Sequence, residues 1–108
     1  MKRKRRSDRN HLIYEIRCIL TDEHYIGVTV MKGNNIKRTL AQRWKAHQYK
    51  AFKLNEPWTL PVAVREYGED AFEVTPIKVI RGKADAFAFE ADLINNTLPI
   101  LNSKYRKK

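Results

Sequence analysis

The sequence predicts one small α+β domain made of three β-strands and about three helices. Two short runs rich in β-branched and aromatic residues flank a polar turn, and a third such run lies further along the chain. Between and after these runs, apolar residues recur at helical spacing. With 108 residues, 43% of them hydrophobic, the chain is long enough for a single core and is not disordered by composition.

A β-hairpin opens the predicted domain. Its strands lie within His11–Leu20 and His24–Val30, and the polar tripeptide Thr21-Asp22-Glu23 provides the turn.

Two tyrosines are placed together by this hairpin. Side chains alternate across a strand, so Tyr14 and, on the partner strand, Tyr25 can stand side by side on one face of the sheet. Gly27 shares the face of Tyr25 and lets another group come close. The alternative interpretation is an ordinary hairpin whose tyrosines belong to the core.

A loop and a long helix follow the hairpin. Glycine and asparagine residues mark a loop over Met31–Lys37, and helical spacing predicts a helix over Ile36–Phe52. Arg43 and His47 are four residues apart, so they lie on one flank of this helix, which Lys50 continues. The flank is either a solvated basic face or a guanidinium and an imidazole aimed at one phosphate. The inward stripe consists of Leu40, Trp44, His47 and Ala51.

The middle of the chain predicts a short helix and an edge strand. The helix covers Leu60–Tyr67, with Thr59 as its N-cap and Gly68 just past its end. The third strand covers Phe72–Ile80, and Pro76 within it cannot donate a ladder hydrogen bond. We therefore expect this strand at a sheet edge or with a bulge.

The last helix, predicted over about Ala84–Asn96, carries an acidic residue where apolar residues are expected. Glu90 falls at the centre of the inward face, which also includes Phe87. A carboxylate in an apolar stripe is costly unless a metal ion, an arginine or a raised pKa compensates its charge. A structural ion pair, for example with Arg43, is one interpretation. Because perturbed acids cluster at functional sites, a functional role is favoured. The other residues of this face are Ala86, Leu93, Ile94 and Thr97.

Most of the net positive charge lies at the two ends of the chain. The formal net charge is +10, residues 1–10 hold six basic residues and one acidic residue, and residues 104–108 hold four basic residues. Such arms bind phosphate backbones irrespective of sequence, and we expect a nucleic acid as partner. Solubilising tails and an anionic membrane surface are the alternatives, but no amphipathic helix accompanies the arms.

Two features of the sequence bear on the cellular compartment in which the protein works. No apolar run approaches the roughly 20 residues of a membrane span, so no membrane contact is expected. Cys18 is the only cysteine, which excludes an intrachain disulfide and fits a reducing cytoplasm. Cys18 and the three histidines also lack the ligand spacing of a structural zinc site.

Taken in order, these residues resemble the GIY-YIG nuclease family, and in particular the small catalytic modules of phage homing endonucleases and certain restriction enzymes. The resemblance covers about residues 12–102. The segment Gln42–His47, with the sequence QRWKAH, is similar to an Arg-Trp-Lys-x-His stretch of those modules. The matching positions are Ile13-Tyr14, Tyr25-Ile26-Gly27, Arg43 with His47, Glu90 and Asn102.

The chain departs from the family in two places. Leu12 stands where the family usually has glycine, a change that narrows the site or merely fills space. The stretch between Gly27 and Arg43 is longer than is typical, and its extra loop, which includes Lys32, either touches the substrate or has no role.

The resemblance implies a three-stranded antiparallel sheet flanked by helices. The nuclease domain would cover residues 11–103, between a basic arm at 1–10 and a basic tail at 104–108. We expect the strand of Tyr14 to be central, because it is the more apolar one. The implied activity is metal-dependent hydrolysis of a DNA phosphodiester, by nicking or by double-strand cutting, with the protein a monomer or a transient dimer on DNA. If the chain is encoded by a phage, it would work in the host cytoplasm.

The resemblance also implies a role for each catalytic residue. Glu90 would be the only protein carboxylate on a Mg²⁺ (or Mn²⁺) ion. Arg43 would hold a non-bridging phosphate oxygen. Tyr14 would take a proton from the attacking water, as a phenolate favoured by Arg43 or His47. Tyr25 would position the water or Tyr14, and His47 is an alternative proton relay.

The remaining residues at matching or neighbouring basic positions are expected to contact the substrate. Asn102 would fix Glu90 or contact the nucleic-acid backbone. The other predicted substrate-binding residues are Gly27, Lys32, Lys45 and Lys50, together with Lys2, Arg3, Lys4, Arg5 and Arg6 of the arm.

Three other functions fit parts of the sequence. A small basic nucleic-acid-binding protein, for example one associated with RNA or the ribosome, explains the charge but not Glu90 or the tyrosine spacing. A degenerate nuclease kept as a binding module would explain Leu12. A nuclease for branched DNA would share the catalytic residues and differ in its substrate.

Overall fold

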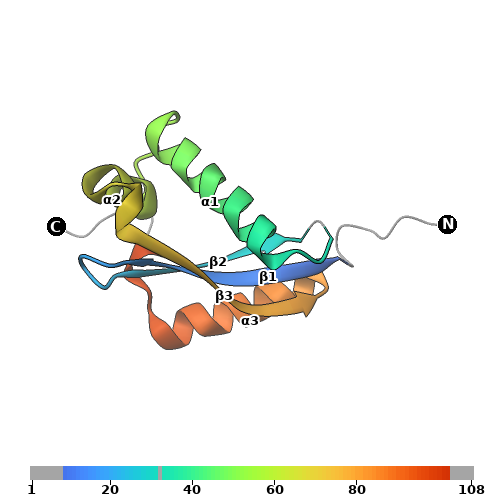
Figure 1. Ribbon diagram of the computed structural model, residues 1–108. Coiled ribbons are helices and arrows are strands. Elements are labelled where there is room, and N and C mark those ends of the chain that lie inside the picture. The colour runs from blue at the N-terminus through green and yellow to red at the C-terminus, as the bar shows by residue number, and fades with distance from the viewer. Residues whose placement is uncertain (1–8, 32, 103–108) are drawn as a thin grey trace.

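The three strands form one antiparallel sheet in the order β2-β1-β3 (Figure 1). The computed structural model describes residues 9–31 and 33–102. Strand β1 (Asn10–Cys18) is central, β2 (His24–Val30) is one edge and β3 (Phe72–Arg81) is the other. The predicted α+β fold and the central position of the Tyr14 strand are therefore confirmed.

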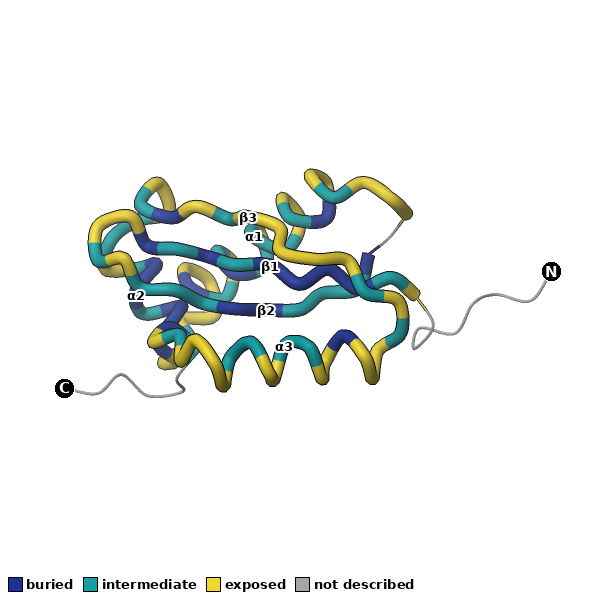
Figure 2. The backbone as a smooth tube through the Cα atoms, turned by 90° about the horizontal axis from the view of Figure 1, so that it is seen from below, coloured by how far each residue is buried: buried dark blue, intermediate teal, exposed yellow. Residues whose placement is uncertain are grey.

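Helices cover both faces of this sheet. Helices α1 (Ile36–Phe52) and α2 (Thr59–Tyr67) lie on one side, and α3 (Lys83–Thr97) lies on the other (Figure 1). Figure 2 shows that α3 runs alongside β2 rather than beneath the middle of the sheet. Two short 3₁₀ segments, η2 (Glu69–Ala71) and η3 (Ile100–Asn102), precede β3 and follow α3. None of the helices among the described residues has the length and apolarity needed to span a bilayer.

The alternation of side chains along β1 divides the core in two. Tyr14, Ile16 and Cys18 are fully buried in the larger cluster, together with residues of α1, α2 and η3. Ile13 points to the opposite face, where it joins Ile26 of β2 and Ala86 of α3 in the smaller cluster. The tyrosine face of the hairpin is thus the face that α1 covers.

Pro76 lies on an edge strand and also at a bulge. Tyr14 pairs with Pro76, whereas Ile13 pairs with Lys78, so β3 contains one residue, Ile77, that has no partner on β1. An edge strand tolerates a proline because the missing N–H faces away from the ladder. Both predicted consequences of Pro76 are found.

The boundaries of the first two helices follow the sequence signals with one exception. Helix α1 begins and ends where predicted, and the side chain of Asn35 caps it by accepting a hydrogen bond from Arg38 N at 2.9 Å. The prediction that Thr59 is the N-cap of α2 is wrong. The extended residue before the helix is Trp58, and Thr59 is already helical and buried. Gly68 ends α2 with a φ of 84°, as its position predicted.

The inward face of α3 also differs from the predicted one. Phe87 is 44% exposed, and its ring packs against the edge of the His11 ring. Phe89 contacts the smaller cluster instead, with Leu93 and Ile94. The predicted face is correct at Ala86, Leu93 and Ile94. Phe87 and Thr97, in contrast, are exposed and Glu90 is half-buried, because α3 lies towards the β2 side of the sheet (Figure 2).

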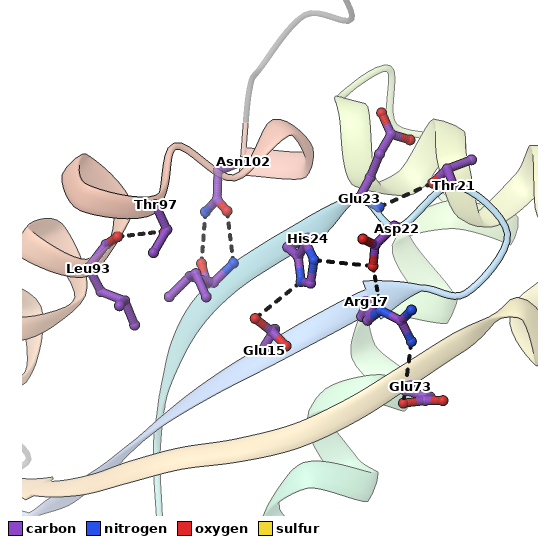
Figure 3. A network of polar contacts seen from close by, with 11 residues as sticks. Glu15, Arg17, Thr21, Asp22, Glu23, His24, Glu73, Leu93, Thr97 and Asn102 are labelled. Atoms are coloured by element: carbon purple, nitrogen blue, oxygen red, sulfur yellow. Dashed lines mark hydrogen bonds and ion pairs between the residues drawn. The ribbon is translucent and has the colours of Figure 1, made fainter.

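A polar network holds the far end of the hairpin (Figure 3). Arg17 Nε donates to Asp22 Oδ1 at 2.7 Å, and His24 lies 3.2 Å from Glu15 and 3.6 Å from Asp22. Asp22 adopts a left-handed backbone with a φ of 57°. Strand β1 ends at Cys18, earlier than Leu20, which leaves a longer turn than predicted. Asp22 is exposed and the other three groups are partly exposed, so they fix the turn more than they stabilise the fold.

Candidate active site

The hydroxyl of Tyr14 is the centre of a cluster made by the first strand and the first helix. Arg43 Nε donates to Tyr14 Oη at 3.0 Å, and His47 Nε2 lies 2.8 Å from the same oxygen. Both partners come from the flank of α1 on which sequence spacing placed them together. Arginine can only donate, so Tyr14 Oη accepts there and its proton is available to His47 Nε2. This assigns the remaining ring proton of neutral His47 to Nδ1.

Burial decides the protonation states of this cluster. It raises the pKa of Tyr14 well above the ordinary value for a phenol, the neighbouring Tyr25 adds to the rise, and Arg43 opposes it only in part. Burial, together with the charges of Arg43 and Lys50, lowers the pKa of His47 to about 3. The expectation that Arg43 or His47 makes Tyr14 a phenolate is therefore wrong for the free protein. Tyr14 is a neutral phenol, and His47 is a neutral imidazole at pH 7.

Tyr25 completes the cluster on the solvent side. Its ring meets the His47 ring edge-on at 5.3 Å between centroids and lies 6.3 Å from the Tyr14 ring. Burial raises the pKa of Tyr25, Arg43 lowers it, and the nearby carboxylate of Glu90 raises it further. Tyr25 is partly exposed, whereas Tyr14 is fully buried, so Tyr25 is the phenol that an incoming substrate meets first.

Gly27 makes room for the Tyr14 ring. A Cβ atom at Gly27 would lie 2.5 Å from Tyr14 Cζ and Oη, and 2.9 Å from the Tyr25 ring. The group that this glycine lets come close is thus the phenol itself. A direct contact between Gly27 and a substrate stays a prediction.

Glu90 reaches this cluster from the other side of the sheet edge. Helix α3 runs along β2, the strand that carries Tyr25, and the Glu90 carboxylate acts on the pKa of the Tyr25 phenol. Glu90 is half-buried, and burial raises its pKa. It forms no hydrogen bond or ion pair with any residue in the described ranges. The alternative in which Arg43 neutralises Glu90 is therefore not what the structure contains.

These donors fit a hard divalent cation better than a soft one. Within residues 9–31 and 33–102, no group of three or more His, Cys, Asp and Glu side chains could hold a metal. A single half-buried carboxylate with an uncompensated charge, beside phenol oxygens, suits Mg²⁺ or Mn²⁺, because Mg²⁺ keeps several waters and takes few protein ligands. Glu90 is the residue that would hold such an ion.

Asn102 has a positioning role that the sequence did not reveal. Its Oδ1 accepts from Ile26 N at 2.8 Å, and its Nδ2 donates to Ile26 O at 2.7 Å (Figure 3). Asn102 therefore acts on the open edge of β2 as one residue of an additional strand would. The predicted contact with Glu90 does not occur, since both ends of the amide bind the peptide between Tyr25 and Gly27.

The predicted basic substrate-binding residues divide into two groups. Lys50 lies near His47, whose pKa it lowers, and Lys45 is exposed on α1. Lys32 and the arm residues Lys2, Arg3, Lys4, Arg5 and Arg6 lie outside the described residues.

Two pockets flank the cluster and include residues that sequence reasoning missed. One, of about 280 Å³, lies at Tyr25 and His47 and has Trp58 in its wall. The other, of about 350 Å³, lies at Arg43 and brings in Lys83. The exposed tryptophan beside Pro57 was a signal for the first pocket. Only the tertiary structure brings Lys83, forty residues away in sequence, towards Arg43.

A guanidinium and an imidazole converge on one phenol, beside a second phenol and within electrostatic range of an uncompensated carboxylate, an arrangement that suits the hydrolysis of phosphate diesters. The chain matches the sequence model of the GIY-YIG catalytic domain over residues 10–106, and it belongs to this family. It is accordingly an endonuclease, a phosphodiester hydrolase whose substrate is DNA. The resemblance, the fold and the enzyme class predicted from sequence are confirmed. No curated protein and no solved structure matches the chain.

Proposed function

We propose that this endonuclease hydrolyses DNA with one divalent cation held by Glu90, and that it acts like a homing-endonuclease module, by nicking or by double-strand cutting. Nucleases of this family generally depend on a divalent metal. The observation that carries the proposal is the half-buried Glu90 carboxylate without a partner among the described residues, near enough for its charge to act on the Tyr25 phenol. When bound, the cation would stabilise charge on the phosphate and on the leaving 3′ oxygen.

Arg43 binds the phosphate in this proposal. Its Nε is used on Tyr14 Oη, which leaves the terminal N–H groups for a non-bridging oxygen. Arginine stays charged when partly buried, so it stabilises the negative charge that builds up on phosphorus.

Tyr14 and His47 move the proton of the attacking water. Forming a free phenolate at Tyr14 is costly, because burial raises its pKa. In a relay no phenolate persists: Tyr14 passes its own proton to His47 Nε2 while it takes one from the water. The cost then falls on His47, whose pKa burial lowers. Tyr14 then stays neutral, and His47 becomes an imidazolium that the bound phosphate stabilises. Tyr25 orients the water, since it is the more exposed phenol.

The departure at Leu12 does not weaken this proposal. Leu12 is fully buried and lines neither of the two pockets beside the cluster. It fills the core and leaves the approach to Tyr25 open. The cytoplasmic location predicted for the protein stays a prediction, with which the buried free thiol of Cys18 agrees.

The substitution Glu90→Gln tests the proposal. It should lower the rate of nicking of supercoiled plasmid in Mg²⁺ by about two orders of magnitude or more, with DNA binding retained in a gel-shift assay. Asp92→Asn, an exposed change on the same helix, is the matched control and should cleave like the parent. Parental cleavage by Glu90→Gln would refute the metal assignment. If the parent binds DNA without cutting it under any divalent metal, the chain is a degenerate nuclease.

A further inference from the structure

A pocket beside the reactive cluster has walls that the hydrolysis of a phosphate does not require. It encloses about 280 Å³ where α1, α2, β2 and η3 meet. Tyr25 and His47 form the side nearest the reaction. The pocket therefore adjoins two residues of the proposed catalytic cluster, and Arg43 is not part of its lining.

Most of the remaining wall is apolar. Trp58, which is 37% exposed, stands at the start of α2, and Leu60, Pro61 and Leu101 continue the surface. The flat faces of an indole and a proline suit a flat ligand. The volume is at the lower end of the roughly 300–1,000 Å³ typical of drug-sized ligands, which indicates one small ring system.

The rest of the lining is polar: the amide of Asn102 is bound to Ile26, which leaves one donor and one acceptor of opposite charge. Lys50 and Glu56 lie at the pocket, and a 3.1 Å hydrogen bond from Glu56 N to Lys50 O holds their backbones together. Neither side chain forms an ion pair with another residue in the described part of the chain. A nucleobase presents both donors and acceptors on its Watson–Crick edge, so it can use both groups.

From these features we infer that the pocket binds one unpaired nucleobase adjacent to the scissile phosphate. The inference rests on the proposed function and specifies its substrate class. A base inside a duplex is stacked and paired, and it cannot reach the pocket without leaving the helix. The preferred substrate is therefore DNA with one unpaired base beside the cut, such as a single-base bulge. Stacking on Trp58 supplies affinity without strong sequence preference.

Cleavage of matched oligonucleotides tests this inference. Two duplexes differ only in one bulged base next to the mapped cut, and the ratio of their single-turnover rates is measured for each protein. The parent should favour the bulged duplex by about tenfold, and Trp58→Leu should bring the ratio close to one. Trp58→Phe should restore part of the preference. Phe52→Leu, a change at a half-exposed aromatic residue outside the pocket, is the control and should keep the parental ratio.

A binding measurement without metal separates this inference from the nuclease proposal. With 2-aminopurine as the bulged base, binding of the parent should change its fluorescence, and Trp58→Leu should abolish that change. If the parent cleaves both duplexes equally and does not change the 2-aminopurine fluorescence, the base-binding pocket is refuted, whereas the nuclease proposal stands. If no duplex is cut, the probe alone decides: a Trp58-dependent change supports the pocket even though the catalytic proposal fails. Should Trp58→Leu not fold, Glu56→Gln replaces it, with partial loss of the preference expected.

Discussion

At the scale of single residues, the Tyr14 hydroxyl binds two side chains, Arg43 and His47, and its position depends on the space left by Gly27. Gly27 leaves the space that the ring occupies, since an added Cβ would lie 2.5 Å from it. Arg43 can only donate to the oxygen, and neutral His47 can therefore accept its proton. The same burial that raises the pKa of Tyr14 lowers that of His47. A standing phenolate and a standing imidazolium are therefore both costly in the free protein, and the proposed relay depends on the charge of the bound phosphate to stabilise the imidazolium.

The first prediction concerns the pH dependence of stability. Burial lowers the pKa of His47 to about 3, against 6.5 in the unfolded chain, so between these values the unfolded state binds more protons. The contribution of neutral His47 to stability is present above pH 6.5 and is lost progressively as the pH falls towards 3. Between pH 7 and pH 5 the parent should lose roughly 2 kcal/mol more unfolding free energy than His47→Gln, measured by urea denaturation.

The ring of His47 gives an independent check. Its imidazole resonances in an NMR titration should keep the chemical shifts of the neutral form below pH 5. An imidazole that titrates near pH 6.5, or equal pH dependence in the parent and His47→Gln, would contradict a buried neutral histidine.

At the scale of helices and strands, the features predicted correctly are those that depend on residues close together in the sequence. Apolar spacing gave α1 its bounds, and Pro76 marked both the edge position and the bulge of β3. The inward face of α3 was wrong at Phe87, because a helical wheel cannot tell where along the sheet a helix lies. Threonine is a common N-cap residue, but Thr59 is buried and already helical, so α2 begins one residue earlier than predicted.

In the candidate site, too, some features could be predicted from nearby residues in the sequence and others could not. Spacing of four on α1 was enough to bring Arg43 and His47 together, and alternation in a hairpin was enough for the two tyrosines. Protonation states could not be predicted, because they depend on burial by elements distant in sequence. The role of Asn102 depends on η3 returning to β2, a contact across 76 residues.

The second prediction concerns that contact. Asn102→Ala removes two hydrogen bonds and leaves the Ile26 peptide without its partners on the open edge of β2. We expect a loss of about 1–3 kcal/mol in unfolding free energy and faster hydrogen exchange at the Ile26 amide. Asn95→Ala, an exposed asparagine on α3, is the control and should change neither. Unaltered exchange at Ile26 would contradict the positioning role.

At the scale of the whole molecule, charge and chemistry are separated along the chain. Residues 1–10 and 104–108 carry most of the net charge of +10, whereas the catalytic cluster lies between them in a nearly neutral body. The family match, over residues 10–106, leaves out most of the N-terminal arm. Binding to phosphates irrespective of sequence and hydrolysis of one bond can therefore be changed independently.

The last prediction uses this separation. Replacing Lys2, Arg3, Lys4, Arg5 and Arg6 by glutamine should weaken DNA binding and flatten the slope of log affinity against log salt, by about 0.9 for each phosphate that the arm no longer neutralises. Cleavage at saturating DNA should change far less than affinity, because the replaced residues lie outside the family match. An arm with the same residues in scrambled order is the control and should keep the parental slope, since counterion release depends on charge and not on order. A slope that stays parental after the five substitutions would show that the arm does not touch DNA and that the body supplies the binding.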